Sequence, residues 1–161
     1  MQYTSTDYKR FLASAPQAQR EYRTIELYHP AFGTYRFVED TEDQVLSSMT
    51  FTAISMRITE PNENKDAETA LTVQLGGVGG EVQAVIDAMS GTDFLTPISC
   101  TYRKWYSGDI SSPVLTLSLS VSNVDFNSYT SVSFTAEDVD FANKKSGEIY
   151  TIARFPMLAG I

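Results

Sequence analysis

The residues that most often carry enzyme chemistry are sparse in this 161-residue chain, which has one histidine, His29, and one cysteine, Cys100. A serine nucleophile needs a histidine and a carboxylate within hydrogen-bonding reach, but His29 follows an alternating stretch, where a structural role is more common. Zinc needs several histidine or cysteine ligands, and we interpret Cys100 as a small buried apolar group of a strand. We therefore predict no catalytic residue, no metal site and no enzyme activity.

Two further stretches resemble ligand-binding loops in composition. The glycine run at residues 76–80 lies between a strand pattern and a helix pattern, as a phosphate loop would, but it lacks the Lys and Ser/Thr of a P-loop and precedes Glu81. The acidic segment 39–43 (EDTED) lacks the alternating Asp/Asn, the Gly and the distal Glu of a calcium loop. We interpret the acidic segment as a solvated turn, with an adventitious cation as the alternative, and we expect no cofactor.

The richest aromatic cluster in the sequence comprises Tyr102, Arg103, Lys104, Trp105 and Tyr106. Such rings can stack on a sugar or on a nucleic-acid base. Successive side chains of a strand point to opposite faces, so only some of these rings could share one platform. We expect core positions with an interface anchor. The alternative is a monomeric β-sandwich that binds host-surface carbohydrate through Tyr102, Trp105 and Tyr106.

The overall charge limits the partners that the chain can hold. Twelve Lys and Arg against twenty Asp and Glu give a net charge of −8, and binding through DNA or lipid phosphates depends on Lys and Arg. The sequence has no run of about 18 apolar residues and no apolar core near its N-terminus. We therefore expect no tight DNA binding, no signal peptide and no insertion into a membrane.

The spacing of apolar residues predicts a mainly β protein. Alternation favours strands at residues 22–29, 35–39, 49–59, 70–75, 97–106 and two within 114–140. In the segment 49–59 the apolar parity changes between Ala53 and Ile54, which indicates a bulge or burial on both faces. A short helix is expected from Ser5 or Thr6 to Pro16. A second helix is expected at residues 81–90, closed by Gly91, with an apolar stripe of Val82, Val85, Ile86 and Met89.

These elements predict one domain over residues 1–161, with a helical arm at 1–20 and a C-terminal extension at 147–161. The expected fold is an antiparallel β-sandwich or partial barrel with one flanking α-helix and a short N-terminal helix. Within it, residues 114–136 alternate apolar side chains with hydroxyls on two neighbouring strands. The hydroxyl face carries Thr116, Ser118, Ser120, Ser131, Ser133 and Thr135.

Three stretches together resemble a known family. They are FLASAP at residues 11–16, TIELYHPAF at 24–32 and IYTIARFPML at 149–158, supported by TEDQVL at 41–46 and PISCTYRKWY at 97–106. In this order and at these separations they are similar to a family of siphophage tail proteins described as a domain of unknown function. The resemblance spans nearly the whole chain and rests on the order of motifs that are individually unspecific.

The resemblance implies a structural virion protein of the distal tail or baseplate of a long-tailed phage, with a fold similar to tail-tube subunits. It implies a ring that links the tail tube to the baseplate hub around the DNA channel. A channel about 40 Å wide needs roughly 20 tilted strands, which about six copies, a hexamer, would supply with four strands each; a ring of three copies is the alternative. The six hydroxyl residues would then face the channel, where uncharged groups and the acidic surplus let DNA pass without specific binding.

We predict that the polar segment 60–68 contacts an adjacent ring through Glu60, Asn62, Glu63, Asp66 and Glu68. The segment has no apolar side chain larger than Ala67, so it cannot order itself by burial. Limited proteolysis should cut the free protein first in this segment and should cut the assembled protein there much more slowly. Equal protection in the two states would contradict the prediction.

Overall fold

The computed structural model describes residues 19–60, 70–128 and 130–138, together with Thr6, Lys9, Arg10 and Ala13. These four N-terminal residues are helical, as the expected short helix requires. Most of the helical arm, residues 61–68 of the polar segment and the extension 147–161 lie outside the described residues.

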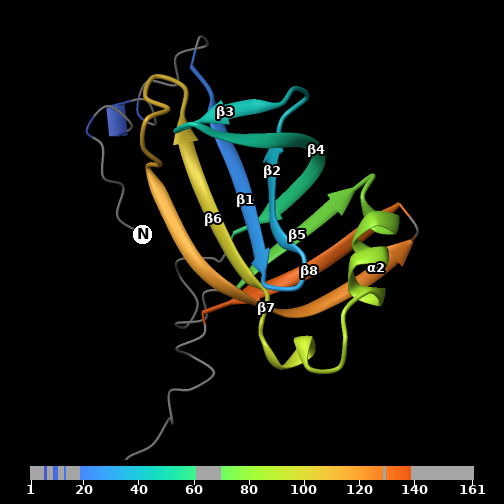
Figure 1. Cartoon of the computed structure of the whole chain (residues 1–161). Coiled ribbons are helices and arrows are strands. Elements are labelled where there is room, and N and C mark those ends of the chain that lie inside the picture. The colour runs from blue at the N-terminus through green and yellow to red at the C-terminus, as the bar shows by residue number, and fades with distance from the viewer. Residues whose placement is uncertain are drawn as a thin grey trace, which may run out of the picture.

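The described residues form a mainly β structure (Figure 1). Apart from the N-terminal residues they contain one α-helix, α2 (Gly79–Asp87), and one 3-10 helix, η1 (Asp93–Leu95). The strands are β1 (Glu21–His29), β2 (Gly33–Glu39), β3 (Gln44–Leu46), β4 (Met49–Thr59), β5 (Leu71–Gly76), β6 (Ser99–Tyr106), β7 (Leu115–Ser128) and β8 (Ser131–Glu137). The predicted strands are thus confirmed, with boundaries that shift by a few residues.

The sheet closes on itself. Its order is β2-β1-β6-β7-β8-β5-β4-β3, and a further pairing of β2 with β4 joins the two sides. This pairing is parallel and matches Phe37 with Thr52, Val38 with Ala53 and Glu39 with Ile54, whereas the other strand pairs are antiparallel. Among the described strands, seven therefore form a closed barrel and β3 is an extra strand. The expected partial barrel is a complete one, built from one continuous sheet.

The barrel interior follows from the alternation of side chains along each strand. One face of β5 buries Leu71, Val73 and Leu75, and neighbouring β8 buries Val132, Phe134 and Ala136. These side chains pack with Ile25, Met56, Ile58, Cys100, Tyr102 and Leu119 in one cluster. The apolar faces that the sequence predicts thus meet inside the barrel.

A second, smaller core lies on the opposite face of the same sheet. It contains Val38, Leu46, Phe51 and Trp105, and Val38 adjoins Phe37, which belongs to the interior cluster. Strand β4 contributes to both cores, with Phe51 on one face and Met56 and Ile58 on the other. Burial on both faces therefore explains the parity change along β4.

Helix α2 differs from the predicted helix at both ends. It begins two residues earlier, after Gly77 turns the chain with a φ of +83°. It ends at Asp87, and the predicted cap Gly91 is not its cap, because Ala88 already follows in that position. Instead, Asp93 accepts hydrogen bonds from the N–H and hydroxyl of Ser90 at 2.8 Å each, which turns the chain away from the helix axis.

No helix in the described part of the chain is long and apolar enough to cross a membrane.

Glu60, just after β4, is hydrogen-bonded to two side chains of β6. Glu60 accepts hydrogen bonds from the Tyr102 hydroxyl at 2.8 Å and from the Lys104 ammonium at 2.7 Å. Lys104 is buried, so its charge needs this partner. Glu60, the first residue of the predicted inter-ring segment, is therefore tied to the barrel within one copy.

Thr24 links the second core to β1, and its replacement tests the packing. The buried indole N–H of Trp105 donates to the Thr24 hydroxyl at 2.9 Å. Thr24→Val should lower the free energy of unfolding by about 1–3 kcal/mol, because this N–H loses its acceptor. Urea denaturation would measure the change.

The same swap at exposed Thr72 of β5 is the matched control and should change stability by less than about 0.5 kcal/mol. In a Trp105→Phe background, which has no indole N–H, the cost of Thr24→Val should fall. An equal cost in both backgrounds would mean that the hydrogen bond does not stabilise the fold.

Candidate functional site

The six hydroxyl residues lie on the outer face of the barrel. Their neighbours in sequence, such as Leu119, Val132 and Phe134, are buried inside. Thr116 and Ser118 are exposed and Ser120 is half-buried, as are Ser131, Ser133 and Thr135. The structure therefore confirms that β7 and β8 are neighbours with a common polar face.

The two hydroxyl rows do not lie side by side, however. Thr116, Ser118 and Ser120 pair with Arg103, Thr101 and Ser99 of β6. Thr135 and Ser133 of β8 pair instead with Asn123 and Asp125 in the second half of β7, beyond a register shift between Val121 and Asn123. The rows are consecutive along the face because β7 is 14 residues long and pairs with β6 first and with β8 afterwards.

The outer face extends over four adjacent strands, β6, β7, β8 and β5, which we call the polar wall. On β5, Thr72 pairs with Thr135 and Gln74 with Ser133. The wall also carries the exposed carboxylates Asp125 and Glu137, which pair with Ser133 and Ser120. Its Arg103 is balanced by Glu26, whose Oε1 lies 3.3 Å from the guanidinium. The wall is thus mainly hydroxyl and amide in character.

The aromatic cluster on β6 is packed into the fold. Tyr102 and Trp105 are 0% exposed and Tyr106 is 6% exposed. Tyr102 belongs to the interior core and Trp105 to the second core, on opposite faces of β6. The predicted core role of these rings is confirmed, and they offer no common platform on which a sugar could stack.

His29 is held as a structural residue. The backbone N–H of Ala31 donates to Nδ1 at 3.1 Å, so the ring proton of the neutral imidazole is on Nε2. Nε2 lies 3.2 Å from the carbonyl oxygens of both Asp93 and Thr96 and donates toward them. His29 is 1% exposed. It therefore ties the end of β1 to η1, as a buried structural histidine does.

The other chemical candidates also have local structural roles. Burial raises the pKa of the Cys100 thiol to about 12, which keeps it protonated at neutral pH. In the acidic turn, Asp40 accepts a hydrogen bond from Gln44, and Asp43 accepts one from the N–H of Ala53 at 2.7 Å. No group of three or more His, Cys, Asp or Glu side chains in the described ranges could hold a metal ion.

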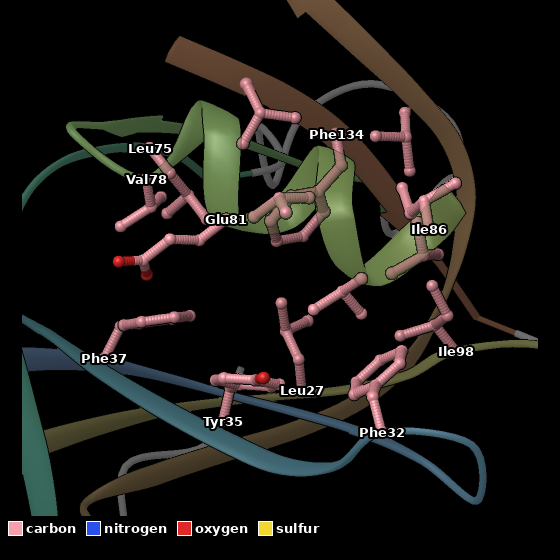
Figure 2. Close-up of a pocket in the computed structure, with 15 residues that line it drawn as sticks. Leu27, Phe32, Tyr35, Phe37, Leu75, Val78, Glu81, Ile86, Ile98 and Phe134 are labelled. Carbon is pink, nitrogen blue, oxygen red and sulfur yellow. The ribbon is translucent and has the colours of Figure 1, made fainter. Parts of the chain in front are cut away.

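A feature that the sequence did not predict is a cavity of about 70 Å³ between α2 and one end of the barrel (Figure 2). Helix α2 covers it with Val82, Val85 and Ile86, which belong to the predicted apolar stripe. The barrel contributes apolar side chains from five of its strands, namely Leu27, Phe37, Leu75, Val121, Val124, Val132 and Phe134. The interior is therefore incompletely filled at this end.

One wall of the cavity is a row of aromatic rings. The His29 ring stacks on Phe32 with centroids 5.3 Å apart, Phe32 lies 5.7 Å from Tyr35, and Tyr35 lies 6.2 Å from Phe37. The β1–β2 hairpin carries the whole row, and Phe32, Tyr35 and Phe37 line the cavity. The hydrogen bonds of His29 thus fix the far end of this aromatic wall.

Among the residues that the structure describes, Glu81 is the only acidic side chain that lines the cavity. It projects from the first turn of α2, where a carboxylate also interacts favourably with the helix dipole. Figure 2 shows its carboxylate on the side of the cavity where Val78 and Phe37 lie. The sequence predicts the apolar stripe of the helix and the alternation of Tyr35 and Phe37 along a strand. It does not predict that these two segments enclose one cavity with Glu81 at its edge.

Residues 7–150 match a family described as a domain of unknown function, DUF1833. The chain belongs to the DUF1833 family. This confirms the part of the predicted resemblance that concerns a domain of unknown function, and the match includes every strand of the DUF1833 barrel. No curated protein matches the sequence.

His29→Phe tests the anchoring of the aromatic wall in this DUF1833 protein. Phenylalanine keeps a ring against Phe32 but removes the contacts to Ala31, Asp93 and Thr96. We expect the free energy of unfolding to fall by about 2–3 kcal/mol in urea denaturation, because buried backbone groups lose their partners.

Tyr28→Phe is the matched control, because Tyr28 directly precedes His29 in the chain but is 48% exposed. Its effect should stay within about 0.5 kcal/mol. If the two variants were equally stable, His29 would not anchor η1 to the hairpin.

Proposed function

We propose that this protein is a structural virion component of the distal tail or baseplate of a long-tailed phage. It forms a ring of about six copies that joins the tail tube to the baseplate hub and lines the DNA channel. The motif order at residues 11–16, 24–32 and 149–158 supports the phage assignment through the family resemblance. The polar wall is the observation that carries the proposed role.

The chemistry of the polar wall suits a surface past which DNA slides. Thr116, Ser118, Ser120, Ser133 and Thr135 are small and uncharged, and they can hydrogen-bond to water. Phosphate binding depends on basic side chains, and Arg103 on this wall is paired with Glu26. The net charge of −8 adds a weak repulsion toward phosphate. DNA would therefore pass such a wall without being held.

The closed barrel limits how the copies can adjoin. Pairing of β2 with β4 completes the barrel within one copy, and of the described strands only β3 lies outside the closed circuit. Copies would therefore line the channel with their polar walls adjacent, rather than by merging strands into one sheet. The requirement of roughly 20 strands applies to one continuous sheet around the channel, so for closed copies the number of about six rests on the resemblance to tail-tube rings.

The proposal predicts the effect of positive charge on the wall. Ser118→Lys combined with Ser120→Lys should leave the subunit folded, because both side chains lie on the outer face while Leu119 stays inside. A ring of about six copies would gain about twelve positive charges, which bind phosphate with a strong salt dependence. DNA ejection from assembled particles should slow at low salt and recover as salt rises.

Ser118→Gln combined with Ser120→Gln is the control, because it adds bulk without charge and should eject normally. Ejection that is unchanged by the lysines at every salt concentration would place this wall on the outside of the tail. Failure of the lysine variant to assemble, while the glutamine variant assembles, would place the wall in a contact between subunits.

A further inference from the structure

The cavity under α2 combines features that are unusual for a packing defect. Its lining is apolar except for the carboxylate of Glu81 and the hydroxyl of Tyr35. Tyr35 is 41% exposed, although its ring belongs to the row that lines the cavity. A packing defect is normally enclosed by apolar groups and stays dry, whereas this cavity reaches the surface at Glu81 and Tyr35, which are both exposed.

No ion pair joins Glu81 to any basic side chain among the described residues. Four ion pairs between described residues lie elsewhere, on β1, β2 and β6 and at Glu60. The nearest groups that line the cavity with Glu81 are hydrocarbon and aromatic ring faces (Figure 2). The negative charge beside the cavity is therefore left for a ligand or for water.

We propose that this cavity binds a small organic cation, a short alkylammonium ion, with its chain among the apolar side chains and its ammonium group beside Glu81. The faces of Tyr35 and Phe37 would add cation–π attraction. A metal cation would find too few oxygen ligands, and an anion would be repelled by Glu81. The proposal does not depend on assembly into an oligomeric ring, because every residue that lines the cavity belongs to one copy.

The size of the cavity sets the length of the ligand. An apolar cavity of about 150 Å³ accommodates benzene, and the space here is about 70 Å³. It therefore holds about three carbon atoms, with the carbon next to the charged group and the charged group itself at the edge. A butyl chain is accordingly the probe of choice.

The test compares n-butylammonium with n-butanol and butanoate, which share the chain and differ in charge. Titration of the full-length protein, followed by NMR shifts of the cavity methyl groups, gives the three dissociation constants. Butylammonium should bind about tenfold more tightly than butanol, and butanoate should bind most weakly. Added salt should weaken the binding of butylammonium but not of butanol.

Variants locate the binding. Glu81→Gln should reduce the affinity for butylammonium to that for butanol and leave the affinity for butanol unchanged. Glu42→Gln in the acidic turn is the matched control, because Glu42 is exposed and does not line the cavity. Tyr35→Leu should weaken butylammonium about threefold through loss of the ring face, whereas Tyr35→Phe should preserve it. Circular dichroism would verify that each variant is folded.

Three results would overturn the proposal. They are equal affinities for butylammonium and butanol, an unchanged preference in Glu81→Gln, and no binding of any of the three probes. Equal affinities would reduce the cavity to an unselective apolar space. The absence of binding would mean that the space is a packing void.

Discussion

The parallel pairing of β2 with β4 is the contact on which the rest of the structure depends. It involves three residue pairs, yet it joins the two sides of an otherwise open sheet. Without it, apolar faces of the strands would be left without a partner layer, because among the described elements one short helix is the main cover. Closure gives every strand of the barrel an interior, and it leaves three-residue β3 as the exposed edge, a length that discourages pairing with other chains.

Closure also decides where a function can reside. The interior is filled by large side chains such as Tyr102 and Phe134, so no channel runs through a single copy. Two places remain: the outer polar wall, and the end of the barrel where the interior side chains and α2 do not fill the space. Both follow from the same alternation, which sends hydroxyls outward and apolar groups inward along β7 and β8.

Local patterns in the sequence predicted the elements well, because strand alternation and the helix stripe are imposed by burial on one face. The parity change in β4 indicated a bulge or burial on both faces, and the structure shows burial on both faces, since Phe51 and Met56 lie in different clusters. Closure was not predictable, because a parallel contact between Phe37 and Thr52 has no local signature. The offset between the hydroxyl rows depends on the register of strand pairing. Apolar patterning determines which face of a strand is buried, but not which residues of two strands pair. The cavity depends on four segments that are distant in sequence, so its residues could not be grouped in advance.

The polar wall and the cavity share one part of the chain. Val121 and Val124 line the cavity from inside, and Asn123 between them lies on the wall. The register shift between Val121 and Asn123 falls at this place, so the hydrogen-bond ladder is interrupted where the strand has a cavity behind it. A strand with an interrupted ladder and an incompletely filled core behind it yields more easily than one backed by a full core. Occupation of the cavity would therefore stiffen the wall locally, which makes this segment the place where the two candidate surfaces are mechanically connected.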